Sequence, residues 1–251
     1  MESEIIYGIH PVFEALQAGR RKFHEIYLAR EPHWRRFGTI ADIAASKNIP
    51  LNKISLPRLG RISETDHHQG IGARVSPYPL EEITDILDRD RPGTGPPFLI
   101  ILDNVMDPHN LGAIIRSALA VDVDGIIIPK DRAVGPTPAV SKASAGMLEH
   151  ARLSRVTNIV TTVKIMKEKG LWLFGLDSAA DQSLFDSDLS GAAAVIIGGE
   201  EKGIRPLVKK SCDVLLSIPQ SKRVESLNAS VAAAVAMYEV FRQRLTADTS
   251  C

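Results

Sequence analysis

The stretch LDNVMDPHNLGAIIRSALA (102–120) combines polar residues of the types that catalysis uses with the pattern of a helix. Apolar residues from Leu111 to Leu119 repeat at helical spacing and predict a buried face. We expect Asn110 at the N-cap of this helix, where its side chain would satisfy a free backbone donor. Arg116 lies off the apolar face, so it is either a solvated residue or one that a substrate can reach.

A second polar loop, GGEEKGI, follows an apolar run at residues 198–204. Glu200 comes directly after Gly198 and Gly199, and glycines at a strand end let a ligand approach the backbone closely. A tight turn with solvated acidic residues would account for the same letters. Glu200 is therefore either a residue of a functional site or a solvated acidic residue of a turn.

A third loop, IPQSKRVESLN (218–228), leads into a helix that we predict from Asn228 to Tyr238. That helix carries no charge and five of its eleven residues are alanine. A helix that is apolar on all sides must be buried on most of them. Ser226 and Asn228 would lie at the buried mouth of this helix, although either could simply cap it.

The apolar runs after residue 97 predict the sheet that would bring these loops together. Near-continuous apolar runs are typical of parallel strands covered on both faces, and the sequence has them at 98–103, 125–129, 171–177, 193–199 and 213–219. Ligands of open parallel sheets bind beyond the carboxyl ends of the strands. The loops expected to converge there are 104–110, 175–181, 198–204 and 218–228.

The first part of the chain predicts a smaller α/β domain. It has helical patterns at 11–18 and 34–47 and strand patterns at 24–29, 49–55 and 70–75. Residues 78–97 end in the breakers Arg-Pro-Gly-Thr-Gly-Pro-Pro, which suits a linker. The predicted organisation is thus a small domain (1–77), a linker (78–97), a parallel-sheet domain (98–246) and a short tail (247–251).

The charge balance argues against a purely electrostatic nucleic-acid binder, because 30 Lys and Arg face 30 Asp and Glu. Residues 1–75 are mildly basic, with 11 basic and 8 acidic residues. The short clusters Arg20-Arg21-Lys22 and Arg35-Arg36 could contact phosphates, although a solvated surface would explain them equally well.

Several other classes of protein are disfavoured by what the sequence lacks. No secretory signal and no run near ~18 apolar residues is present, which leads us to expect a cytoplasmic protein without a membrane partner. Cys212 and Cys251 make neither a disulfide framework nor a zinc site, so we expect no metal. GTGPPF precedes a strand instead of following one, and GGEEKGI has Ile204 where a phosphate loop needs lysine. Both observations argue against ATP and NAD sites.

The three polar loops together resemble the motifs of a known family. DPHNLGAIIRSA, IIGGEEKGI and IPQSKRVESLNASVA, in this order, are similar to the three motifs of the SpoU (TrmH-like) ribose methyltransferases of the SPOUT superfamily. YGIHPVFEAL and HHQGIGARV resemble the amino-terminal substrate domain of its RlmB-type members, which has the L30e-like fold of ribosomal proteins. The likeness covers about residues 5 to 244.

The resemblance implies an enzyme that transfers a methyl group from S-adenosylmethionine to a ribose 2′-oxygen of RNA. It also implies a homodimer and an α/β fold whose carboxyl-terminal domain is tied in a trefoil knot. By position in the motifs, the residues for substrate binding and catalysis are Asn110, Arg116, Glu200, Ser226 and Asn228. The positions implied to hold the cofactor are Gly198, Gly199, Ile218 and Leu227.

The substrate that the resemblance implies is a guanosine ribose in 23S rRNA, because the RlmB-like amino-terminal signature is present. The same reaction on tRNA or another rRNA position, as in TrmH-like or thiopeptide-resistance enzymes, is the alternative. A non-catalytic RNA-binding assembly factor would keep the fold but lose the five catalytic positions. Lys222, where the family usually has glycine, and Met147, where it usually has alanine, depart from the pattern.

Overall fold

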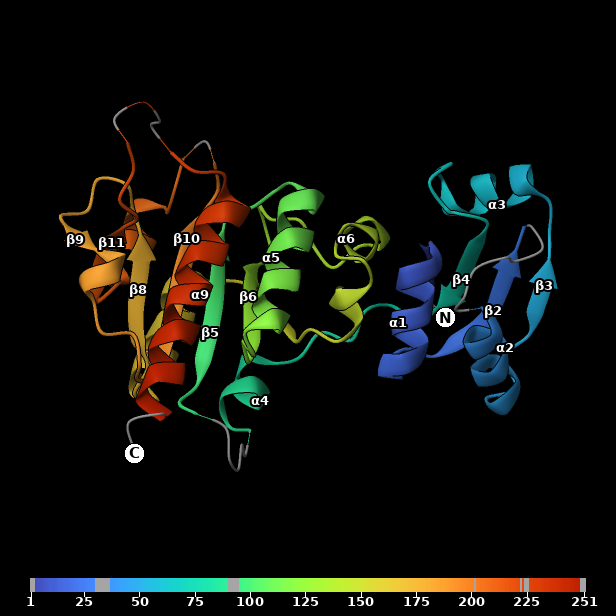
Figure 1. Ribbon diagram of the computed structural model, residues 1–251, viewed down its shortest axis with the longest axis horizontal. Helices are drawn as coiled ribbons and strands as arrows, with labels where there is room; N and C mark the ends of the chain where they lie inside the picture. The colour runs from blue at the N-terminus through green and yellow to red at the C-terminus, as the bar shows by residue number, and fades with distance from the viewer. Residues whose placement is uncertain are drawn as a thin grey trace. The chain divides into compact units, whose positions relative to one another are not determined.

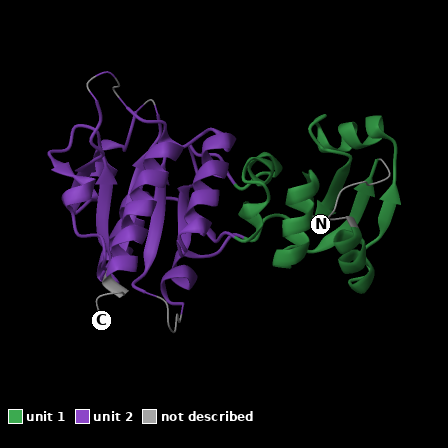
Figure 2. Cartoon of the chain, in the orientation of Figure 1, with its two compact units in different colours: residues 1–79, 136–150 green, residues 80–135, 151–251 purple. Residues whose placement is uncertain are grey.

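The chain forms two compact units in the computed structural model (Figure 2). The structure describes residues 3–29, 37–89, 95–200, 202–221, 223 and 226–248. Unit 1 consists of residues 1–79 and 136–150, and unit 2 of residues 80–135 and 151–251. The sequence led us to expect 98–246 as one domain, but 136–150 leaves that domain and packs within unit 1.

Unit 1 is built around a four-stranded sheet in the order β1-β4-β2-β3 (Figure 1). β4 pairs antiparallel with β1 and β2, and β2 pairs parallel with β3. Its core is apolar and includes side chains from α1, α2 and three of the strands. The elements are β1 (Glu4–Tyr7), α1 (Ile9–Ala18), β2 (Phe23–Leu28), α2 (Phe37–Ser46), β3 (Leu51–Lys53), α3 (Leu56–Ser63), β4 (Ile71–Val75), α6 (Pro138–Ala143) and a 3-10 helix, η1 (Met147–Glu149).

A buried charge network attaches the segment 136–150 to the rest of unit 1. Arg21 Nε donates to Glu149 Oε2 over 2.6 Å, and both side chains are only 1% exposed. The hydroxyl of Ser141 donates to Glu149 Oε1 over 2.7 Å, and Arg21 also pairs with Glu4. Burial raises the pKa of Glu149, while the adjacent Arg21 guanidinium opposes that shift. Removing either partner of such a buried pair would leave an uncompensated charge.

The first basic cluster of the sequence is therefore mostly not available to a phosphate. Arg21 is in the buried network, and Arg20 donates to the carbonyl of Pro79 over 3.3 Å beside the Tyr78 ring. Lys22 alone of the three is exposed. Arg35-Arg36, together with Trp34 at the start of the predicted helix, lies outside the described residues.

Unit 2 is a parallel α/β unit around a seven-stranded sheet in the order β7-β6-β5-β10-β8-β11-β9. All six strand pairs are parallel, which confirms the predicted architecture. The elements are α4 (Ile83–Leu87), β5 (Phe98–Asp103), α5 (Pro108–Ala120), β6 (Gly125–Pro129), β7 (Leu153–Val156), α7 (Ile159–Glu168), β8 (Trp172–Leu176), β9 (Gln182–Ser183), η2 (Leu184–Asp186), β10 (Ala193–Gly198), α8 (Pro206–Ser211), β11 (Val214–Ser217) and α9 (Ala229–Asp248).

Helices cover both faces of this sheet. Ile86 of α4, Val163 of α7 and Val208 of α8 belong to one core cluster with alternate residues of β5 and β10 and with Leu173 of β8. α5 and α9 lie side by side on the other face (Figure 1). This arrangement explains why the strands read as continuous apolar runs.

Two predicted boundaries differ from the structure. The predicted linker, 78–97, contains α4, whose Ile86 is only 4% exposed in the core of unit 2, and residues 90–94 of the linker lie outside the described part. The alanine-rich helix runs to Asp248 instead of Tyr238, into the predicted tail, because its charged second half is held by bonds such as Gln243 to Glu239. In the part of the chain that the structure describes, no helix is long and apolar enough to span a membrane.

Candidate active site

The first polar loop places Asn110 inside helix α5, so the predicted N-cap was wrong. Asp107 is the N-cap, and its side chain accepts from the backbone N–H of His109 over 3.0 Å. Pro108 follows at the first helical position, which favours helix initiation there. Asn110 is 9% exposed, and its amide is left to bond with side chains from other loops.

A chain of hydrogen bonds joins the three polar loops through Asn110. Asn110 Nδ2 donates to Glu200 Oε1, and Asn228 Nδ2 donates to Asn110 Oδ1 over 3.1 Å. Asn228 Oδ1 in turn accepts from the backbone N–H of Ser230 over 2.9 Å, which caps α9. Every donor in this chain points toward the Glu200 carboxylate, so the bonds polarise one another and fix the orientation of both amides. Residues 110, 200 and 228, far apart in the sequence, thus meet in one place.

The two remaining predicted catalytic residues lie outside this hydrogen-bond chain. Arg116 is exposed on α5, and no hydrogen bond or ion pair joins it to another described residue. It lies six positions after Asn110, about 9 Å along the helix axis. Ser226 is exposed and lines a cavity of about 620 Å³ beside this hydrogen-bond chain.

Asp103, which the sequence reasoning missed, holds the Glu200 loop in place. Its carboxylate accepts from the backbone N–H of Arg205 over 2.8 Å and from Arg205 Nε over 2.7 Å. Its backbone carbonyl accepts from the N–H of Gly199 over 2.8 Å. The Asp103 side chain is fully buried. The signal in the sequence was an acidic residue that ends an otherwise apolar strand.

Gly198 and Gly199 are required by close packing of the backbone. A Cβ on Gly199 would lie 2.2 Å from the carbonyl oxygen of Asn104, and one on Gly198 would lie 2.1 Å from the carbonyl carbon of Gly203. Gly203 itself has a φ of 59° and donates its N–H to the Gly199 carbonyl over 2.9 Å. The loop after β10 is therefore a tight turn against the end of β5.

A cavity of about 620 Å³ opens at the carboxyl ends of β8, β10 and β11. All four predicted cofactor positions, Gly198, Gly199, Ile218 and Leu227, line it, and so do Glu200 and Ser226. Its volume lies within the range of sites for whole small-molecule ligands. This placement agrees with the rule that parallel sheets bind ligands at this edge.

The lining of this cavity fits a ligand that joins an apolar ring to polar groups. Leu176 and Leu216 contribute apolar walls. Asp177 offers a carboxylate whose pKa is held below its usual range by Lys209 and by the backbone N–H of Ala179. Gln220 Oε1 is buried and has no hydrogen-bond partner among the described residues, so it is an acceptor open to a ligand. Adenosine with an attached amino acid has rings, hydroxyls and amino groups to match these features.

Of the two departures from the family pattern, only Met147 lies in the described part of the chain. Lys222 lies outside the described residues. Met147 is half-buried in η1 within unit 1.

Models of two protein families match the chain. The SpoU rRNA Methylase family matches residues 97–238, and the RNA 2′-O ribose methyltransferase substrate binding family matches residues 5–81. The 23S rRNA (guanosine-2′-O-)-methyltransferase RlmB of Shewanella oneidensis is 40% identical over 97% of this chain and 98% of its own. An uncharacterized tRNA/rRNA methyltransferase of Synechocystis sp. is 38% identical over 96% of this chain, which spans 63% of that protein's length.

The same fold occurs among solved structures. An rRNA methyltransferase from Sinorhizobium meliloti, with AdoMet bound, has a TM-score of 0.79 and 22% sequence identity. The superposition covers 96% of this chain and 87% of the other. On the family matches, the full-length relative and the convergence of the three motif loops, the chain belongs to the SpoU family of RNA 2′-O-ribose methyltransferases.

Proposed function

We propose that this protein methylates the ribose 2′-oxygen of a guanosine in 23S rRNA, with S-adenosylmethionine as the methyl donor. The observation that carries the proposal is the meeting of Glu200, Asn110 and Asn228 beside the 620 Å³ cavity. The 40% identity to a guanosine-2′-O-methyltransferase of 23S rRNA over nearly the whole of both chains supports the substrate. The AdoMet in the Sinorhizobium meliloti structure supports the donor.

The cavity residues would bind and orient the donor. Bound S-adenosylmethionine would supply an electrophilic methyl group on its sulfonium. Leu227 and the backbone at Gly198 and Ile218 would enclose the adenine, and Asp177 and Gln220 would hold polar groups of the ligand. The amides of Asn110 and Asn228, fixed by Glu200, would orient the ribose at the cavity mouth.

Arg116 would stabilise charge on the reacting oxygen. A 2′-hydroxyl is a weak nucleophile until its proton leaves, so the site must stabilise developing negative charge. A guanidinium stays protonated at neutral pH. We therefore assign Arg116 an electrostatic role, in which it binds a phosphate near the ribose and favours loss of the hydroxyl proton. Its exposed position without an ion-pair partner among the described residues leaves it free to do so.

The variant Arg116→Ala tests this role. We expect methylation to slow by two or more orders of magnitude, roughly the cost of one transition-state contact of this kind. Affinity for S-adenosylmethionine should change little, because Arg116 does not line the cavity. Single-turnover kinetics and calorimetry measure the two effects. A rate like that of the wild type would exclude the role.

The substrate is tested by methyl transfer to separate RNA pools. Labelled S-adenosylmethionine is incubated with the protein and with unmodified 23S rRNA or tRNA, and the methylated nucleotide is mapped. We expect label in one guanosine of 23S rRNA. Label in tRNA would favour the alternative reaction, which the name of the Synechocystis relative makes the second candidate.

We further infer a homodimer that pairs through α9. Val231, Tyr238 and Leu245 are 47%, 51% and 54% exposed and recur every seven residues, so they form one apolar stripe on this helix. Sedimentation should give a dimer, and Tyr238→Glu should give a monomer. The trefoil knot and the cytoplasmic location remain proposals that rest on membership of the family.

A further inference from the structure

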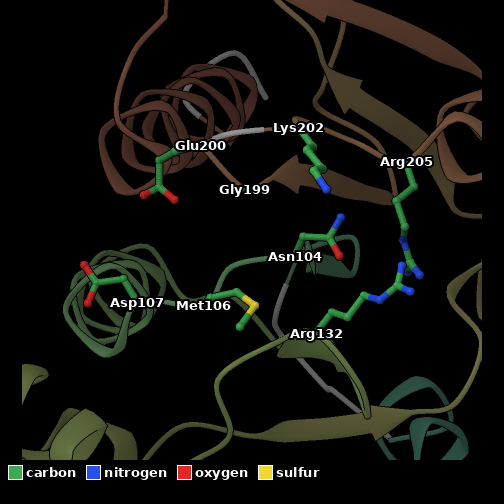
Figure 3. A pocket seen from close by; sticks show the side chains of 8 residues that line it. All are labelled: Asn104, Met106, Asp107, Arg132, Gly199, Glu200, Lys202 and Arg205. Carbon is green, nitrogen blue, oxygen red and sulfur yellow. The ribbon is translucent and has the colours of Figure 1, made fainter.

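A second cavity, of about 700 Å³, adjoins the cofactor cavity across the Glu200 loop. Gly199, Glu200 and Lys202 line both cavities. The second is also lined by Asn104, Met106, Asp107, Arg132 and Arg205 (Figure 3). The neighbouring cavities share one wall, so an occupant of the second lies next to the proposed reaction site.

The charges in this second cavity are segregated. Figure 3 shows the guanidinium ends of Arg132 and Arg205 directed to the same side, with the Lys202 ammonium reaching toward the centre. Glu200 and Asp107 lie on the other side in this view, and both are engaged, with Asn110 and with the backbone of α5. The cavity is thus lined by three cations, of which Arg205 alone is paired with a described acid, and a bound anion would offset their mutual repulsion.

The backbone geometry around Arg132 supports a functional role for this residue in the second cavity. Arg132 has a φ of 59°, in the left-handed region that side chains other than glycine, asparagine and aspartate seldom adopt, and Asn104 has a φ of 65° in the same region. The backbone N–H of Val134 donates to the carbonyl of Val105 over 3.0 Å, which ties the Arg132 segment to the Asn104 segment. Strained residues that are held by their surroundings cluster at functional sites. Arg132, the strained residue here, lines the cavity.

We propose that this cavity binds a phosphodiester of the RNA strand that carries the target ribose, through Arg132, Arg205 and Lys202. The inference rests on the proposed function and deepens it. A guanidinium fork matches two phosphate oxygens, and a lysine adds a point charge. Met106, 63% exposed, offers an apolar contact for the adjoining nucleotide. The cavity positions the strand so that one ribose reaches the hydrogen-bonded residues Asn228, Asn110 and Glu200.

The variant Arg132→Gln tests the inference, since Arg132 is exposed and does not line the cofactor cavity. The probe is unmodified 23S rRNA transcript, and its affinity is measured as salt is raised. Loss of one phosphate contact should make the slope of log affinity against log salt shallower by about 1. Arg132→Lys should keep the slope and bind more weakly. Lys164→Gln, an exposed cation on α7, is the control and should match the wild type.

Phosphate ethylation interference gives a second readout. Ethylation of one phosphate near the target should block binding by the wild type and have no such effect on Arg132→Gln. A wild-type slope and interference pattern in Arg132→Gln would overturn the inference. So would an equal loss of S-adenosylmethionine affinity, which would assign the cavity to the cofactor. Because these assays measure binding, a wild type that binds but methylates no RNA would overturn only the proposed reaction.

Discussion

Asn110 uses both ends of its amide, and this is possible because Asp107 caps the helix in its place. The amide donates to Glu200 and accepts from Asn228. A carboxamide donates from its nitrogen and accepts at its oxygen, which neither an ionised aspartate nor a leucine can do. The function of Asn110 therefore depends on a structural role taken by a residue three positions earlier.

The hydrogen-bond chain from Asn228 through Asn110 to Glu200 predicts that mutations in it have non-additive effects on the rate of methylation. Asn110→Ala and Asn228→Ala should each slow methylation by roughly 100-fold, because misplacing a positioned group has about that effect. The double variant should be little slower than either single one, since groups that act as a unit are lost together. Single-turnover rates of the three variants measure this.

Asn158 provides the matched control for these single and double variants. It caps α7 by accepting from the backbone N–H of Val160 over 2.9 Å and takes no part in the hydrogen-bond chain. Asn158→Ala should lower stability by about 1 kcal/mol and leave the rate unchanged. If the rate losses of Asn110→Ala and Asn228→Ala multiply in the double variant, the two residues act independently.

Among the elements, the turn after β10 is held closely at both of its ends. Asp103 fixes both its ends, and the two glycines press against the neighbouring backbone. Its residues separate the two cavities. A displacement of this turn would therefore disturb the cofactor and the RNA phosphate together.

Gly199→Ala should show this dependence. The added Cβ would meet the Asn104 carbonyl at 2.2 Å, so the ends of β5 and β10 must separate. We expect a loss of about 1–3 kcal/mol in the free energy of unfolding, together with weaker binding of S-adenosylmethionine. Gly191→Ala, with no atom within 4 Å of the new Cβ, is the control and should stay within about 0.5 kcal/mol. Denaturant unfolding and calorimetry measure both, and equal behaviour of the two variants would contradict the packing argument.

The sequence predicted the elements whose signal is local. The apolar runs gave β5, β6, β8, β10 and β11 nearly to the residue, and from them the edge at which the loops meet. The segment 136–150 could not be placed, because Val140 and Leu148 are as apolar as a residue of either core. Arg21 reads as a surface cation, and only its distant partner Glu149 makes it a buried one. The resemblance supplied the candidate catalytic residues, while the contacts of Asp103, Asp177 and Arg132 needed coordinates.

At the scale of the whole molecule, the two units are joined by more than one connection, because the chain returns to unit 1 at residues 136–150. The connection from β6 to β7 runs through unit 1, where Val140, Leu148 and Glu149 are buried. Deletion of residues 1–77 would expose these side chains and leave Glu149 without Arg21. We therefore expect that truncation to aggregate and to lose RNA methylation.

A second truncation separates the two effects. With 1–77 deleted and 136–150 replaced by a Gly-Ser linker, the remaining chain should stay soluble and bind S-adenosylmethionine, because the cavity is made by unit 2 alone. It should not methylate 23S rRNA. Calorimetry and labelled methyl transfer measure these outcomes, and full methylation without residues 1–77 would remove their role in choosing the RNA.

The path of the chain through both units also constrains how such enzymes can be recombined. A chimaera that takes residues 1–79 from a relative with another RNA specificity inherits half of an interface and keeps the native 136–150 as the other half. The two partners of an ion pair such as Arg21–Glu149 would then come from different parent proteins. Exchange of specificity should thus succeed only when both pieces are grafted from the same parent, so the two segments are inherited as one.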